Sequence, residues 1–516
     1  MIRYTSEKQQ PLSGFETPFE ATLDENNRWV NLSQLIPWDK LANAYYSALH
    51  SSHGRPAKDA RLIIGAVIIK HKLKLSDEET IEQIKENIYQ QYFVGLKMFQ
   101  SQAIFVPSLF VEIRKRMGED VFKVFEQSII DSVNAKQTGR SDDDDDAGSG
   151  SSCDEGEASG QPTHQGKLIL DATVVEQAIR FPTDLSLLNE AREISEQIID
   201  TLYPKTSLKN KPRTYRQKAR KAYLAIVKRR RPGKKLYRKG NKQQLQYLRR
   251  NFGHIEKLLD SLPGREIALS HKQHRQYWII QTLYAQQEGM YKNKSKRCDD
   301  RIVSISQPHV RPIIRGKLNK AVEFGAKLSV SLTGDGIACV DQLRWDAFHE
   351  AQDLEGQVKA YYDRHGYYPE KVLADPLYGT RANRDYLKAH GIHFAGKPLG
   401  RPKKATAQNK AQLKREKQQR QDDYCQRIPI EGKFGQGKNG YGLNKIKAKT
   451  PRTSFAWINS IFFVMNLMVL YKLFLLPGII QRWLGAGCQL MNKICSEWFS
   501  QVHYPRISHP SVDCSK

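Results

Sequence analysis

Apolar residues recur at helical spacing through the first 135 residues of the chain. One apolar segment opens at Pro56-Ala57 and runs through Ile69, and another carries Ile81, Ile84 and Ile88. Ser76 and Glu79 precede the second segment with the spacing of a capping box. A third helix is predicted over 108–133. The pattern therefore predicts an all-α N-terminal domain over residues 1–135.

Consecutive short helices ahead of a basic region are typical of a helix-turn-helix-like DNA-binding domain. A helical dimerisation or packing domain would give the same periodicity. The pattern alone does not separate these two alternatives.

Beyond residue 168 the pattern changes to short apolar runs typical of strands. They lie at 168–175, at 327–332 and 337–340 around an Asp335-Gly336 hairpin turn, at 371–375 and at 393–396. Helices are predicted near 351–365 and 383–389, and a mobile basic loop over 401–420. The order predicts an α/β domain over 168–476, in which a mixed sheet is packed against helices. A basic helical insertion over about 190–300 follows the first strand.

Two segments fall outside these domains. Residues 136–167 contain the run Asp142–Asp146 followed by Gly, Ser and Glu, which is typical of a disordered linker. Adjacent aspartates on a flexible segment are a poor metal-ligand set. Residues 477–516 form a C-terminal tail, preceded by the apolar stretch Ile461–Leu476. That stretch contains Asn466 and Lys472 and is shorter than the roughly 20 residues of a membrane span, so a buried helix is predicted.

The charge of the chain favours a polyanionic partner. Its 82 Lys and Arg against 55 Asp and Glu give a net charge of +27. Between Lys205 and Arg250 there are 19 basic residues and no acidic residue, with Arg229, Arg230 and Arg231 consecutive. This stretch is the expected non-specific DNA footprint, although a solvated basic helix is the alternative. Seven scattered cysteines without a CxxC pair, and no apolar N-terminal signal, indicate a reducing, cytoplasmic location.

Three acids are candidates for chemistry. Asp171 and Asp375 each follow apolar residues near the end of a predicted strand, where an unpaired carboxylate is costly unless it binds a partner. Glu431 lies in the pattern Y-x2-R-x3-E-x6-K formed with Tyr424, Arg427 and Lys438. On an ideal helix these four positions share an arc of about 60°. Pro429 and nearby glycines weaken the helix prediction, and a helix starting at Pro429 would leave Tyr424 and Arg427 before it.

The Y-R-E-K spacing resembles the signature of insertion-sequence transposases of the IS4/IS5 type. Asp375-Pro-Leu-Tyr378-Gly379 resembles the second-aspartate motif of these proteins, and Asp171-Ala-Thr resembles the first. Residues 54–96 resemble the N-terminal helical domain of IS5-like members. The resemblance covers most of residues 35–475. Pro429 departs from the pattern.

The resemblance implies an RNase H-like DDE core in which Asp171, Asp375 and Glu431 converge as catalytic residues and ligands of two Mg²⁺ or Mn²⁺ ions. It implies a DNA transposase that cleaves at terminal inverted repeats and joins them to target DNA by two-metal phosphoryl transfer. DNA contacts are expected from Tyr424, Arg427, Lys438 and Tyr378. A homodimer in the prokaryotic cytoplasm, associated with the nucleoid, is the expected form.

Two other functional classes stay open. One is a related nuclease without strand transfer, and the other is an inactive or domesticated transposase-derived DNA-binding protein. The sequence contains no HxxxH, HExxH or P-loop motif, so neither histidine-based chemistry nor a nucleotide cofactor is expected. No membrane partner is expected.

Overall fold

A computed structural model describes residues 15–17, 22–49, 57–138, 164–262, 268–314, 322–401, 406 and 408–474. Most of the acidic segment predicted as a linker, and the C-terminal tail, lie outside the described residues. So do Pro56 and residues 402–405 and 407 of the segment predicted as a basic loop.

The described residues of the N-terminal part form seven helices: α1 (Arg28–Leu35), α2 (Trp38–Ser47), α3 (Ala60–Leu73), α4 (Asp77–Glu86), α5 (Ile88–Phe93), α6 (Leu109–Arg116) and α7 (Glu119–Thr138). The capping box is confirmed, because the Ser76 side chain accepts from the Glu79 backbone and the Glu79 side chain accepts from the Ser76 backbone. The single helix predicted over 108–133 is wrong. It is divided into α6 and α7 at Met117 and Gly118, since glycine disfavours a helix interior.

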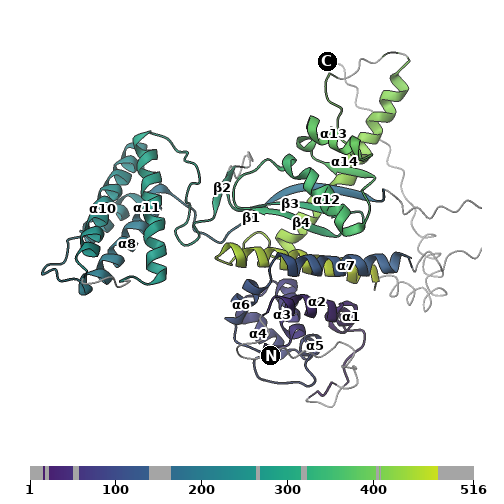
Figure 1. The fold of residues 1–516 in the computed structure, drawn as a ribbon, viewed down its shortest axis with the longest axis horizontal. Helices are drawn as coiled ribbons and strands as arrows, with labels where there is room; N and C mark the ends of the chain where they lie inside the picture. Colours follow the sequence, from purple (N-terminus) through teal and green to yellow (C-terminus); the bar gives the residue numbers. More distant parts are fainter. Residues whose placement is uncertain are drawn as a thin grey trace, which may run out of the picture.

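A helical unit lies between the first two strands and apart from the sheet (Figure 1). It contains α8 (Asp184–Leu202), the 3₁₀ turn η3 (Tyr203–Lys205), α9 (Arg216–Val227), α10 (Lys234–Asp260) and α11 (His271–Lys292). Ile199, Leu248 and Ile280 belong to an apolar core that this unit has to itself. The unit therefore buries its own hydrophobic surface instead of covering the sheet.

The chain is of the mixed α/β class, with one sheet in the order β2-β3-β1-β5-β6 and β4 also paired with β3. The strands are β1 (Lys167–Glu176), β2 (Arg311–Ile314), β3 (Val322–Thr333), β4 (Ala338–Arg344), β5 (Lys371–Ala374) and β6 (His393–Ala395). β3 is antiparallel to β1, β2 and β4, whereas β5 is parallel to β1 and to β6. The predicted hairpin is confirmed, and Gly336 occupies its turn at φ 85°.

Alternate residues of β1 face opposite layers of the protein. Leu168 and Leu170 pack with α12 (Leu354–His365) and α13 (Arg381–Ala389). Ile169 and Val175 belong to the larger core on the other face, which α7, α14 (Lys410–Gly440) and the helix Pro451–Phe474 share. Two 3₁₀ turns, η4 (Glu350–Asp353) and η5 (Pro376–Tyr378), connect to α12 and α13.

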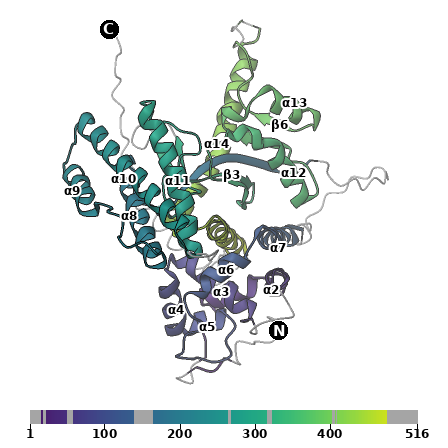
Figure 2. The same ribbon diagram turned by 60° about the vertical axis from the view of Figure 1, so that its left-hand side comes forward.

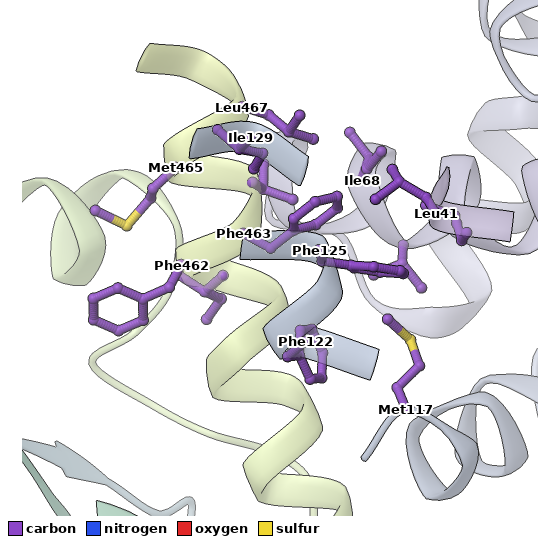
Figure 3. Packing of buried hydrophobic residues seen from close by; sticks show 14 of the residues in the cluster. Leu41, Ile68, Met117, Phe122, Phe125, Ile129, Phe462, Phe463, Met465 and Leu467 are labelled. Carbon is purple, nitrogen blue, oxygen red and sulfur yellow. The ribbon is translucent and has the colours of Figure 1, made fainter. Parts of the chain in front are cut away.

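The helix Pro451–Phe474 lies beside α7 beneath the sheet (Figure 1). The rings of Phe125 and Phe463 pack with centroids 4.8 Å apart, and Ile129 and Leu467 lie beside them (Figure 3). It is the one helix within the described ranges long and apolar enough to cross a membrane, and 89% of its most apolar window is buried. The prediction of a buried helix is therefore confirmed for the part up to Phe474.

A buried polar cluster connects the N-terminal helices to this same helix. Asp77 accepts from Lys70 at 2.9 Å and from Arg114 at 2.7 Å. Both cations also lie over the Trp457 ring, at 4.7 and 5.0 Å from its centroid. The cluster pairs the Asp77 carboxylate with two cations, and it fixes α3, α4 and α6 against the C-terminal helix.

Candidate active site

Asp171 lies in the middle of β1, not at a strand end as predicted. β1 continues to Glu176 because it pairs with β3 along its whole length, with Asp171 opposite Val330. The carboxylate is on the same face as Ile169, which α14 covers, and its Oδ1 accepts from the Ala172 amide at 2.7 Å.

Asp375 follows β5 directly, as predicted. Leu170 of β1 and Ala374 of β5 are partners in the parallel ladder, so the two aspartates are the next residues along adjacent strands. Asp375 caps the short turn η5, since its Oδ1 accepts from the Leu377 amide at 3.2 Å. The sheet therefore brings these two acids together.

Helix α14 carries all four positions of the Y-R-E-K pattern. It begins at Lys410, so the part of the predicted basic loop from residue 410 onward is helical, and a helix start at Pro429 is wrong. The Lys, Gln, Glu and Arg residues of this part are good helix formers, which explains the difference. Pro429 lies inside the helix and has no N–H, so the Cys425 carbonyl loses its helical donor.

Contacts on both sides of Pro429 hold α14 against the sheet. Asp423 forms an ion pair with Lys371 of β5 and is buried. Ile430 is fully buried and Phe434 nearly so, both in the large core. These anchors set the position of the turn between them.

Arg427 links two of the candidate acids. Its guanidinium lies 2.5 Å from Glu431 Oε1 and 3.5 Å from Asp171 Oδ2. It also lies 5.6 Å from the centre of the Tyr424 ring. The Arg427 side chain is only 12% exposed, whereas that of Glu431 is 51% exposed, so Glu431 is at the solvent-facing end of the pair.

Negative charge is crowded around Asp171. Burial raises the pKa of its carboxyl, the nearby carboxylates Asp375 and Glu350 raise it further, and the Ala172 amide and Arg427 act in the opposite direction. The sequence did not indicate Glu350 as a site residue, because it lies on a short 3₁₀ turn outside any strand or helix motif.

The three predicted acids are not gathered into one cluster in this structure. Within the described ranges, no three His, Cys, Asp or Glu side chains are arranged to hold a metal ion. Asp171 and Asp375 follow paired residues of adjacent strands, whereas the Arg427 guanidinium lies between Asp171 and Glu431.

An open pocket of about 430 Å³ lies between α14 and the β5–β6 edge. Asp375, Tyr424 and Arg427 line it together with three further cations that were not singled out from the sequence: Lys397, Lys417 and Arg420. Two of these three lie in the segment predicted as a mobile loop, where their alignment on a helix could not be foreseen.

Tyr378 cannot make the predicted DNA contact in this structure, because it is fully buried under the site. Its hydroxyl has no hydrogen-bond partner among the described residues. Burial raises its pKa, and the charges of Glu350 and Asp171 raise it further. We therefore assign it to packing beneath the acids.

The remaining predicted DNA contacts lie elsewhere. Arg229, Arg230 and Arg231 are exposed in the connection between α9 and α10, and α9 lies on the side of the helical unit that faces away from the sheet (Figure 2). The structure does not bring them to the acids. Lys438 is partly exposed near the C-terminal end of α14.

Two family models match the chain. Residues 372–468 match "Transposase DDE domain", a range that includes Asp375 and Glu431 but not Asp171. Residues 17–116 match "Transposase domain (DUF772)", which spans α1 to α6.

A curated relative is "Uncharacterized protein ORF8 in nfe locus" of Rhizobium meliloti. It is 29% identical over 189 residues, which are 36% of this chain and 81% of that protein. No solved structure matches. The two transposase domains, one over the N-terminal helices and one over the segment that carries Asp375 and Glu431, indicate an insertion-sequence transposase.

Proposed function

We propose that this chain is a DDE transposase of the IS4/IS5 type, which binds the terminal inverted repeats of its element, cleaves there and joins the ends to target DNA. The observation that carries the proposal is the arrangement around Arg427. One guanidinium bridges Asp171 and Glu431, and Asp375 lies beside Asp171 on the adjacent parallel strand. Carboxylates on adjacent strands with cations beside them suit a metal-dependent reaction on a phosphate.

An RNase H-like core is part of the proposal. The order of the strands supports it: three antiparallel strands, β4, β3 and β1, continue into the parallel strands β5 and β6. The helical unit enters after β1, as expected for an insertion after the first strand.

The donor chemistry fits Mg²⁺ or Mn²⁺, because carboxylate oxygens are the hard ligands these ions prefer. The crowding of Asp375 and Glu350 around Asp171, which raises the Asp171 pKa, is a charge imbalance that a divalent cation would relieve. Asp171 and Asp375 would hold the metal, with Glu431 completing the set, and two ions are proposed. When bound, the metal ions would activate a water or a DNA 3′-OH as the nucleophile and stabilise the leaving oxygen.

The side chains of the pocket have separate roles in this proposal. Arg427 exchanges its carboxylate partners for a DNA phosphate, for which its planar guanidinium is suited. Lys397, Lys417 and Arg420 line the same pocket and neutralise the neighbouring phosphates. The Tyr424 ring is 55% exposed, and with Lys438 it supports the transposon end near the cleavage point.

The other parts of the chain are assigned by their charge and position. The N-terminal helices recognise the terminal repeats. The helical unit, in which Arg229–Arg231 are exposed, binds DNA phosphates without sequence specificity. The protein acts as a homodimer that holds two transposon ends together. Its location is the cytoplasm, in association with the nucleoid.

The test is cleavage of a labelled duplex that carries the element's terminal repeat, in Mg²⁺, by the wild type and by Asp375→Asn. Asp385→Asn is the matched control, because Asp385 is exposed on α13. We expect nicking at the repeat boundary that Asp375→Asn abolishes and Asp385→Asn retains. Unchanged cleavage by Asp375→Asn would refute the assignment of the acids.

A second candidate is a transposase-derived DNA-binding protein without chemistry. The observation that favours it is that Asp171 and Glu431 are both ion-paired with Arg427, so a metal ion could bind them only after these contacts change. Repeat binding that needs no metal, with no cleavage, identifies this candidate. Cleavage without joining of paired ends identifies a nuclease.

A further inference from the structure

A second pocket lies at the junction of the N-terminal helices with the C-terminal half of the chain. It has a volume of about 340 Å³ and opens between α1, α3, the end of α14 and the helix Pro451–Phe474. None of its lining residues also lines the pocket that contains Asp375.

Three cations from three different helices converge on this pocket. Arg28 is the first residue of α1, Lys72 lies in the last turn of α3, and Lys472 lies near the end of the C-terminal helix. No carboxylate lines the pocket, and no ion pair joins the three to an acid within the described part of the chain. Burial lowers the pKa of Lys72, and the positive charges of Arg28 and Lys472 lower it further. Within the described residues, like charges therefore lie together without a carboxylate between them.

Aromatic rings form the walls between these cations. Trp29 and Tyr441 are buried to 4% and 8% exposure, and Tyr471 is partly exposed. Lys72 lies 5.9 Å from the centre of the Tyr441 ring and Arg28 lies 5.5 Å from the centre of the Trp29 ring, so two of the cations are next to aromatic rings. The partly exposed Tyr471 has the accessible aromatic surface for a base, while the cations accept a phosphate.

We propose that this pocket binds one nucleotide unit, with its phosphate against Arg28, Lys72 and Lys472 and its base against the aromatic walls. The volume lies at the lower end of the range for small-ligand pockets, which suits a single nucleotide better than a longer segment. A simple anion would use the cations and leave the rings unoccupied.

The position of the pocket points to a DNA strand as the source of the nucleotide, and to this extent the inference rests on the proposed function. Gln436 lines the pocket five residues beyond Glu431 on α14, a helix rise of about 7.5 Å. The two side chains lie on different sides of the helix, so a strand engaged at both would pass around α14. The pocket would then hold one nucleotide of an unpaired strand end while the adjoining phosphates reach the acids. A free mononucleotide offers the same phosphate and base, and the experiment distinguishes a DNA strand from a free mononucleotide.

Binding of 5′-deoxyadenosine monophosphate to the full-length chain is measured by calorimetry, without Mg²⁺ and in the Asp375→Asn background. We expect saturable binding, at least tenfold weaker for inorganic phosphate alone and for deoxyadenosine alone. The double variant Lys72→Gln/Lys472→Gln should weaken nucleotide binding at least tenfold. Lys359→Gln/Lys388→Gln removes the same charge from exposed positions of α12 and α13 and should change nothing.

Thermal unfolding checks that the variants are folded, and Lys72→Arg should retain binding. Absence of saturable nucleotide binding, or equal binding by the two double variants, would overturn the inference. Phosphate alone binding as tightly as the nucleotide would also overturn it, because the aromatic walls would then have no role.

Two further arms assign the source. A duplex with a short unpaired end should displace the mononucleotide, and the Lys72→Gln/Lys472→Gln variant should lose its preference for that duplex over a blunt one. Binding of the mononucleotide that no DNA displaces would overturn the strand assignment. Cleavage by the wild type without nucleotide binding would refute this inference alone, whereas nucleotide binding without cleavage would refute the proposed function alone.

Discussion

Replacing Asp77 by Asn should be among the most destabilising single changes in the N-terminal helices. The carboxylate accepts hydrogen bonds from two cations that are almost completely shielded from solvent: the side chains of Lys70 and Arg114 are 2% and 9% exposed. Arg114 makes two hydrogen bonds to Asp77, at 3.0 and 2.7 Å. The amide of Asn cannot neutralise either positive charge.

The magnitude follows from the burial of these partners. Removing one member of a buried ion pair costs about 3–5 kcal/mol, since the remaining charge is left uncompensated. Two cations are affected here, and Asp77 itself is 20% exposed, which reduces the effect of each. Contacts with the Trp457 ring keep part of the stabilisation. We therefore expect a loss of about 3 kcal/mol in the free energy of unfolding.

Urea denaturation followed by circular dichroism measures this loss, and Glu112→Gln is the matched control. Glu112 also carries a lysine partner at 2.7 Å, but its pair with Lys115 is about half exposed, so a change within about 0.5 kcal/mol is expected. Equal stabilities of Asp77→Asn and Glu112→Gln would refute the argument that burial makes the cluster important.

The same cluster predicts a pH dependence. Arg114 and Lys70 hold the pKa of Asp77 below its ordinary value against the opposing effect of burial. The stabilisation is therefore present above the unfolded pKa, near 4, and is lost as the pH falls through the folded pKa. Asp77→Asn should remove this part of the acid sensitivity, whereas persistence of the same pH profile would contradict the assignment.

Three further predictions concern other parts of the fold. Burial raises the pKa of Glu126 to about 7. As the pH rises from roughly 4.5 to 7, the free energy of unfolding should therefore fall by up to about 3 kcal/mol. Urea titrations across this range should show that Glu126→Gln removes the fall. Neutralising Arg229–Arg231 together should reduce the slope of log K for DNA against log salt by up to about 2.7, and an unchanged slope would place the footprint elsewhere. A Cβ at Gly325 would lie 1.9 Å from the Val175 carbonyl oxygen, so Gly325→Ala should lower the free energy of unfolding by at least about 1–3 kcal/mol, measured by thermal unfolding. A Cβ at Gly432 would have no atom within 4 Å, so Gly432→Ala should not lower it.

Features encoded by neighbouring residues could be predicted from the sequence. The Ser76 capping box and the Asp335-Gly336 hairpin each depend on a few adjacent positions, and the structure contains both. Asp375 was placed at the end of its strand for the same reason, because the apolar run stops there.

Features that depend on distant pairing could not be predicted in this way. The extent of β1 past Asp171 is set by its partner β3, some 150 residues later, and not by its own residues. The contact between Arg427 and Asp171 joins positions 256 apart in the chain. The Y-R-E-K spacing identified Arg427 as a candidate, but only tertiary structure shows that it occupies the space between two acids.

The proline inside α14 has a consequence for how the site can change shape. A proline in a helix interior costs about 3 kcal/mol relative to alanine, and here the anchors at Asp423 and Ile430 hold the helix together across it. The missing hydrogen bond falls in the one turn that contains Arg427 and lies just before Glu431. Bending α14 at this turn breaks fewer bonds than bending it elsewhere. The guanidinium and the glutamate therefore lie beside the turn of α14 whose backbone hydrogen bonds least resist a change of shape.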